Sequence, residues 1–142
     1  MTTDSVADCL PPEMRGLDTV IAKIAAGLSG AGVYRVDAGG QAYVLKLAAD
    51  SESAADWGGA LTIQRLAAGA ELAPRIVHVD EQRRAVLAAF VADRSFGSFY
   101  TDPRSHLAAV VMLGQTVRRI HALAIPADAP QRDPRAKTHP PG

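Results

Sequence analysis

A glycine-rich segment, residues 27–32, lies between two apolar runs and constrains the fold more than any other part of the chain. A second glycine pair, Gly39-Gly40, separates residues 33–37 from residues 42–47, which is the pattern of a β-hairpin. We therefore expect a strand, a tight loop, a second strand, a hairpin turn and a third strand. Glycine lets a loop backbone adopt positive φ angles and approach a ligand closely.

The third expected strand carries one lysine, Lys46, between two leucines. Lys46 follows Val44 at a spacing of two residues, so both side chains should point to one face of a sheet. Bare amides of a glycine-rich loop bind phosphate oxygens, and a lysine ammonium beside the loop would pair with the same anion. The pattern indicates a nucleotide site, although glycine-rich hairpins with a solvent-exposed strand lysine are also common in proteins that bind no nucleotide.

Length and charge limit the class of protein. The chain has 142 residues, 48% of them hydrophobic, which is enough for one modest globular domain. The 15 basic and 15 acidic residues give zero net charge, so the charge favours neither nucleic acid nor an anionic membrane as a partner. The N-terminus lacks a signal sequence, no apolar run is long enough to span a membrane, and the single cysteine excludes an intramolecular disulfide. We therefore expect a cytoplasmic protein.

After the third strand, the pattern changes from helical to extended. Residues after Ser53 predict a helix of about 14 residues with Gly69 as its C-terminal cap. Residues 76–79 and 85–91 predict two strands joined by a polar turn. With a first strand within residues 21–28, these elements predict an α+β fold: a five-stranded antiparallel sheet with one helix inserted after its third strand.

The C-terminal half contains the clearest helical pattern. Residues 93–103 are expected to form a loop that contains Phe96, Phe99 and Tyr100, and residues 105–124 to form a long amphipathic helix. The apolar face of this helix must pack on the sheet, pack on a second copy of the chain, or remain exposed as an adhesive surface. Self-association through the helix is therefore one expectation.

The two ends of the chain lack the patterns of regular structure. Residues 1–16 are polar and contain Pro11-Pro12, which predicts a flexible N-terminal arm. Five prolines fall within residues 125–142, so this tail is expected to be disordered.

Four local strings carry a resemblance to a known family. They are LSGAGVYRV at 28–36, YVLKL at 43–47, LAAG followed by AP at 66–74, and LGQ followed by RRIHAL at 113–123. In this order they resemble the nucleotide-positioning loop, the lysine strand, the end of the lobe helix and the first C-terminal-lobe helix of the aminoglycoside phosphotransferase/choline kinase-like family, which has the protein-kinase-like fold. The resemblance covers residues 16–124.

The resemblance implies a division of the chain and an activity. Residues 17–92 would form a nucleotide-binding N-terminal lobe, and residues 93–124 a linker and the first helix of a C-terminal lobe. The implied activity is an ATP-dependent phosphotransferase (kinase) that transfers the γ-phosphate to a small-molecule hydroxyl, with ATP or GTP and Mg²⁺ as cofactors. Aminoglycosides, choline-like amino alcohols and sugars all remain open as acceptors.

The resemblance also assigns nucleotide contacts to individual residues. Those implied at the phosphates are Lys46 and the loop residues Ser29, Gly30 and Ala31. Those implied at the purine are Val44, Ile76, the gatekeeper Ala88, and the hinge residues Ala89, Phe90 and Val91. At the hinge, the carbonyl of Ala89 and the amide of Val91 would bind the purine edge, with Phe90 between them.

Two departures from the family pattern stand out. The helix glutamate that pairs with the strand lysine in the family falls on Gly59, which leaves Asp56 and Glu52 as candidate substitutes. The family's His-Gly-Asp catalytic loop and its metal-binding asparagine and aspartate would lie beyond the region of resemblance, and the sequence ends at Gly142 without them. The resemblance thus assigns no catalytic and no metal-binding residue, and we expect a chain truncated before its catalytic loop.

Three functions therefore remain open from the sequence. The first is phosphotransfer by an intact parent protein, with the present chain binding the nucleotide. The second is a non-catalytic kinase-like fragment that binds a nucleotide or a protein partner. The third is an ordinary small α+β interaction domain whose glycine-rich loop is only a hairpin.

Overall fold

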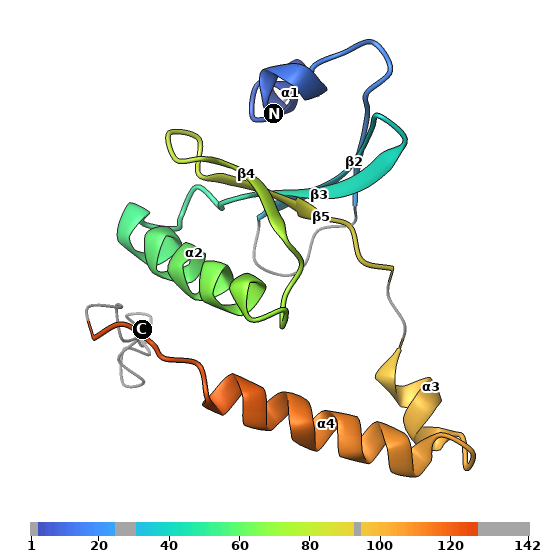
Figure 1. The fold of residues 1–142 in the computed structure, drawn as a ribbon. Helices are drawn as coiled ribbons and strands as arrows, with labels where there is room; N and C mark the ends of the chain where they lie inside the picture. The colour runs from blue at the N-terminus through green and yellow to red at the C-terminus, as the bar shows by residue number, and fades with distance from the viewer. Residues whose placement is uncertain (1–2, 25–30, 93–94, 128–142) are drawn as a thin grey trace, which may run out of the picture.

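The computed structural model describes residues 3–24, 31–92 and 95–127, and its centre is one antiparallel sheet with a helix on each face (Figure 1). The strands are β1 (Val20–Lys23), β2 (Gly32–Ala38), β3 (Gln41–Leu47), β4 (Ile76–Asp80) and β5 (Ala85–Ala89). They lie in the order β1-β2-β3-β5-β4, and every neighbouring pair is antiparallel. Helix α2 (Ala54–Gly69) follows the third strand. The predicted α+β fold is confirmed.

The β2–β3 hairpin forms as the glycine pair predicts. Ala38 pairs with Gln41, so Gly39 and Gly40 are the two residues of the turn. Their φ angles are +58° and +75°, a region that costs glycine little and other residues more. Two consecutive positive φ angles give a turn whose twist matches that of the flanking strands, which sets the register of the whole hairpin.

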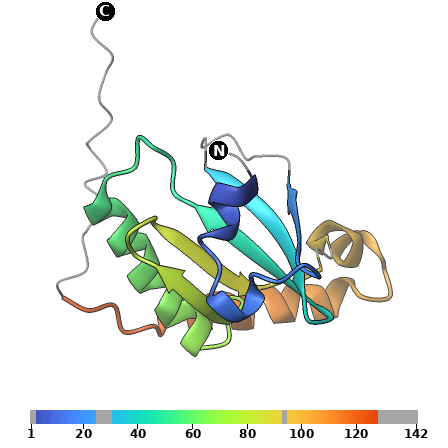
Figure 2. The same cartoon turned by 90° about the horizontal axis from the view of Figure 1, so that it is seen from above.

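The first face of the sheet is covered by the N-terminal segment. Helix α1 (Thr3–Ala7) and the short 3-10 helix η1 (Pro12–Met14) lie over it, as Figure 2 shows from above. The segment contributes Val6, Cys9 and Leu10 to the same buried cluster as the strand residues Val36, Tyr43, Leu45, Leu47 and Leu87. The prediction of a flexible arm over residues 1–16 is wrong for the described part of this segment, because its three apolar side chains are removed from water on the sheet.

Helix α2 begins with a side-chain cap. Ser53 Oγ accepts a hydrogen bond from the Asp56 amide at 3.1 Å, and the hydroxyl also donates to the Asp56 carboxylate at 2.7 Å. A serine at this position satisfies one of the amides that have no partner in the first turn of a helix. The helix buries Leu61 and covers the second face of the sheet, opposite to α1 (Figure 1).

The end of α2 differs from the prediction. Gly69 is the last helical residue and Ala70 is the cap, while the positive φ angle, +59°, falls on Glu71. The amide of Leu72 bonds to the carbonyl of Ala67 at 2.8 Å, and that of Glu71 to Ala68 at 3.1 Å. This is a Schellman motif in which a glutamate occupies the position that glycine favours.

Two helices follow the sheet instead of a loop and one helix. Helix α3 (Phe96–Thr101) replaces the loop predicted over residues 93–103. It is one short helical segment, in which Thr101 Oγ1 donates to the Gly97 carbonyl at 2.8 Å and the rings of Phe96 and Tyr100 lie 6.0 Å apart. Helix α4 (His106–His121) lies within the predicted range 105–124.

Helix α4 runs past α2 at the edge of the sheet domain (Figure 1). The Arg119 guanidinium donates to the carbonyl of Ala70, which joins α4 to the end of α2. Ala109 is the one buried residue of α4, and the large apolar side chains of this helix are exposed, which was one of the three expected outcomes. No helix in the described ranges is both long and apolar enough to cross a membrane.

Candidate functional site

The second face of the sheet carries Lys46 in a row of cross-strand neighbours. Lys46 of β3 pairs with Val33 of β2 on one side and with Val86 of β5 on the other. Val86 in turn pairs with Val79 of β4. Because directly opposite residues of antiparallel strands share a face, the lysine is the one charged side chain in a row of valines.

A second row lies two residues further along the strands. Val44 pairs with Arg35 of β2 and with Ala88 of β5, and Ala88 pairs with Ile76 of β4. The structure thus brings Val44, Ile76 and Ala88 together on the Lys46 face, as their predicted purine contacts require. It adds Val33, Arg35, Val79 and Val86, which the sequence analysis missed. The alternation of side chains along a strand would have placed Val33 and Arg35 on this face. Counting back two residues from Ala88 would have added Val86.

The predicted hinge begins where β5 ends. The Ala89 amide donates to the carbonyl of Arg75 at 2.9 Å, and the Phe90 amide donates to the carbonyl of Ala42 at 3.1 Å. Val91 is exposed. These bonds fix the main chain at Ala89 and Phe90 as it leaves the second row. The contact of the Ala89 carbonyl and the Val91 amide with a purine stays a prediction.

Arg35 lies at the end of this face that is next to the predicted hinge. Its guanidinium lies 4.7 Å from the centre of the Phe90 ring, a cation–π arrangement. Its Nε is 3.0 Å from Asp37 Oδ2. The hydrogen bond and the charge of Asp37 raise the pKa of Arg35, so this side chain is a fixed positive charge at neutral pH.

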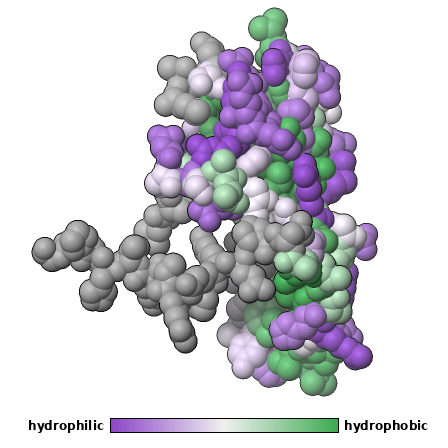
Figure 3. Space-filling view, turned by 90° about the vertical axis from the view of Figure 1, so that its left-hand side faces the viewer, coloured by the Kyte–Doolittle hydropathy of each residue, from purple (hydrophilic) through white to green (hydrophobic). Residues whose placement is uncertain are grey.

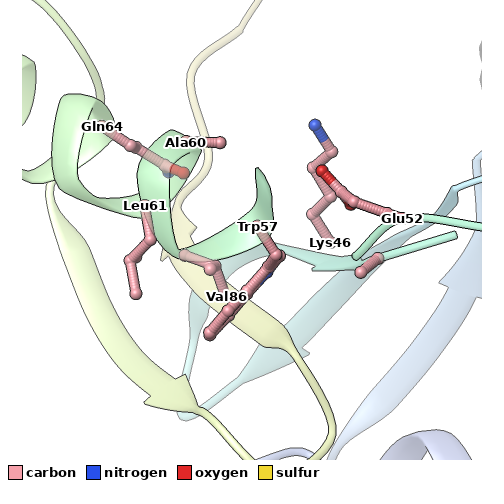
Figure 4. Close-up of a pocket in the computed structure, with 8 residues that line it drawn as sticks. Lys46, Glu52, Trp57, Ala60, Leu61, Gln64 and Val86 are labelled. Atoms are coloured by element: carbon pink, nitrogen blue, oxygen red, sulfur yellow. The ribbon is translucent and has the colours of Figure 1, made fainter. Parts of the chain in front are cut away.

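Lys46 lines a small pocket between the sheet and α2. The pocket has a volume of about 40 Å³ and is lined by Lys46, Ala48, Glu52, Trp57, Ala60, Leu61, Gln64 and Val86. Figure 4 shows the carboxylate end of Glu52 turned toward the Lys46 side chain, with Trp57 and Leu61 of α2 near Val86. Pockets that enclose drug-sized ligands measure about 300 Å³ or more. A nucleotide would therefore lie over the sheet face and not inside this pocket.

The helix supplies no acid to this pocket. Gly59 has no side chain, and Asp56, which the sequence left as one substitute, bonds to the cap residue Ser53 and does not line the pocket. Glu52, the other substitute, does line it, from the turn that precedes α2. Gln64, which the sequence analysis did not single out, lines it from the second half of α2.

The predicted phosphate loop falls mostly outside the described residues. Ser29 and Gly30 are not described, so their predicted position over the phosphates stays a prediction. Ala31 is described and is buried. It directly precedes β2, the strand whose Val33 pairs with Lys46.

A second, apolar pocket lies between α3 and α4. It measures about 420 Å³ and is lined by Phe96, Phe99, Ser105, Ala108, Ala109, Met112, Leu113 and Thr116. Tyr100 does not line this pocket, and its ring lies 4.6 Å from that of His106, the first residue of α4. The two phenylalanines thus pack against α4, which fits a structural role, and the lining offers little to bind a polyhydroxyl compound.

Comparison with known proteins agrees with the fold. A sequence profile of the phosphotransferase enzyme family matches residues 20–140. No curated protein sequence matches the chain. The fold is similar to the crystal structure of a choline/ethanolamine kinase family protein from Mesorhizobium loti, with a TM-score of 0.61 and 21% identity. The match covers 89% of this chain and 41% of that protein, so the chain spans less than half the length of its structural relative.

Proposed function

Because this chain belongs to the phosphotransferase enzyme family, we propose that it binds the nucleotide in the transfer of the γ-phosphate of ATP to the hydroxyl of a small molecule. The features that support this proposal concern the nucleotide half of the reaction. The single observation that supports the proposal best is the position of Lys46, the one charged side chain in a row of valines on the sheet face that leads into the linker.

In the proposed binding mode, the row that contains Lys46 binds the phosphates, and the row that contains Val44 binds the purine. The Lys46 ammonium would form charge-assisted hydrogen bonds with the phosphates, which are stronger than those between neutral groups. The apolar side chains of Val44, Ile76 and Ala88 would pack against the purine and exclude water from it. The main chain at Ala89 and Val91 would bind the purine edge and so fix its orientation.

Mg²⁺ is the metal that the family resemblance implies, as counter-ion of the triphosphate. Residues 3–24, 31–92 and 95–127 contain no group of three or more His, Cys, Asp or Glu side chains that could hold a metal ion. These residues therefore do not fit a metal centre of their own, and we assign them contacts with the nucleotide alone. The acceptor hydroxyl is the second proposed partner.

Calorimetric titration of the chain with ATP tests the proposal. Lys46→Ala should weaken ATP binding by about tenfold or more, because a hydrogen bond to a charged group contributes about 1.5 to 3 kcal/mol. Lys23→Ala, which removes an exposed lysine of the edge strand β1, is the matched control and should leave the affinity unchanged. Equal affinity of the wild-type chain and Lys46→Ala for ATP would contradict the proposal.

A further inference from the structure

We infer that Glu52 is the positioning residue that orients Lys46 toward the phosphates, in place of an acid on α2. The inference rests on the proposed function, because it concerns the same lysine. It goes further by assigning this role to a residue in the turn before α2 and by excluding Asp56, the other acid that the sequence offered.

The pocket brings the two side chains together. Both Lys46 and Glu52 line the pocket of about 40 Å³, and Glu52 is its one carboxylate. The pocket is too small for a nucleotide but has room for ordered water between the two side chains. Figure 4 shows the Glu52 carboxylate turned toward the lysine.

The backbone of Glu52 is fixed from both sides. Its amide donates to the carbonyl of Ala49 at 2.9 Å, and its carbonyl accepts a hydrogen bond from the Arg84 guanidinium. The carbonyl of Arg84 in turn accepts from the Ala48 amide at 3.0 Å. The turn that carries Glu52 is thereby tied to the start of β5, and the next residue, Ser53, caps α2. A carboxylate on such a fixed backbone restricts the positions of a flexible lysine.

Helix α2 contributes no acid to the pocket that Lys46 lines. Gly59 cannot supply one, and the Asp56 carboxylate accepts the Ser53 hydroxyl at 2.7 Å. Within the described ranges, the two ion pairs are Arg35–Asp37 and Arg83–Asp80, so Lys46 and Glu52 share the pocket without a direct salt bridge. The carboxylate therefore acts as a nearby opposite charge that limits where the ammonium extends, and leaves its protons available to phosphate.

The test measures the affinity of the full chain for ATP and for adenosine, which lacks the phosphates. Glu52→Gln should weaken ATP binding by about fivefold, the size expected for one partly exposed charge pair, and leave adenosine binding unchanged. Asp56→Asn is the matched control, one turn further on, and should change neither affinity. In a Lys46→Ala background, Glu52→Gln should have no further effect on ATP binding, because the carboxylate acts through the lysine.

The outcomes separate this inference from the proposed function. If Lys46→Ala weakens ATP binding and Glu52→Gln does not, Glu52 has no positioning role, and the lysine site remains. Tighter ATP binding by Glu52→Gln would also overturn the inference, because the carboxylate would then act only by repelling the phosphates. An equal loss of adenosine binding would show a structural effect on the sheet and contradict the positioning role.

Discussion

The sheet and the α3–α4 segment contain similar apolar residues, but the sheet buries them and the α3–α4 segment leaves most of them exposed. Leu45, at the centre of β3, is fully buried (0% exposed), whereas Leu107, in the first turn of α4, is 75% exposed. In Figure 3, hydrophobic side chains gather at the lower end of the molecule, where Figure 1 places α4. The sheet covers its apolar residues with the N-terminal segment on one face and α2 on the other, and in the described ranges α4 finds no such cover.

The difference indicates which part of the chain buries enough of its own apolar surface to be stable without the other part. Each face of the sheet has a partner within residues 3–92, so the apolar surface that drives folding is buried there. The α4 face is joined to the sheet domain mainly at its end, through Arg119 and Ala70. We therefore expect the sheet domain to fold without the apolar face of α4, and we expect this face to be the part that self-associates.

Truncation of one leucine in each region gives the largest expected contrast. Leu45→Ala should lower the free energy of unfolding by about 3 to 5 kcal/mol, because it leaves a cavity in a closed core. Leu107→Ala should change it by less than about 0.5 kcal/mol. Urea denaturation followed by circular dichroism gives both values. Similar losses for the two variants would mean that α4 is part of the same core.

The N-terminal segment offers a second contrast, which tests where the sheet region begins. Leu10 is fully buried and Leu17, just before β1, is fully exposed. Leu10→Ala should cost about 2 to 3 kcal/mol, since a terminal segment can adjust around the cavity, and Leu17→Ala should cost almost nothing. The same denaturation experiment measures both. No loss for Leu10→Ala would restore the prediction of a flexible arm.

The sequence predicts the sheet and α2 better than the N-terminal segment and α3, and physical reasons explain why. Strict alternation and the Gly39-Gly40 turn specify the hairpin locally, and the placement of Lys46 with Val44 on one face follows from the same alternation. The burial of Leu10 depends on contacts with strands far away in the chain, which no local pattern shows. The aromatic residues of α3 lie in a short segment whose helical turn depends on side-chain to main-chain bonds, such as that of Thr101 to Gly97.

The candidate site likewise contains positions that the sequence could predict and positions that only the folded structure shows. The positions of Val44, Ile76 and Ala88 on one face were predictable once the family resemblance fixed the strand order. The sequence could not show that Glu52 is the acid that shares the pocket with Lys46, because this depends on how the turn before α2 packs against Arg84. The position of Arg35 over Phe90 joins two segments that are distant in the sequence, so only the folded sheet shows it.

The end of α2, where the sheet domain meets α4, gives a smaller effect. Glu71→Gly should stabilise the chain by about 0.5 to 1 kcal/mol, because glycine relieves the cost of the positive φ angle. Gly69→Ala should stabilise it by a similar amount, since no heavy atom lies within 4 Å of an added Cβ and alanine favours the helix. Thermal denaturation compares the two variants with the wild-type chain. A loss of stability in Glu71→Gly would argue against the left-handed residue at this position.

The β4–β5 turn gives the smallest expected effect, and it depends on pH. Burial raises the pKa of Asp80, but the hydrogen bonds and charge of Arg83 outweigh it and hold the pKa below its ordinary value of 3.8. The ionised carboxylate therefore stabilises the fold above the ordinary pKa, and this contribution is lost as the pH falls through the lower folded value. For one partly exposed pair it should be below about 1 kcal/mol.

Asp80→Asn tests this contribution. The stability difference between wild-type chain and variant should be present at neutral pH and shrink as the solution is acidified below the ordinary pKa. A difference that stays constant with pH would show that the hydrogen bonds, and not the charge, account for the effect of Asp80.

The central claim is that a nucleotide binds on the Lys46 face of the sheet, and methyl NMR tests it most directly. The Lys46 face carries the methyl groups of Val33, Val44 and Val86, and the opposite face carries those of Val36, Leu45 and Leu87. On titration with ATP, the account predicts shifts of the first set, with little change in the second. Equal shifts in both sets, or no shift at millimolar ATP, would contradict it.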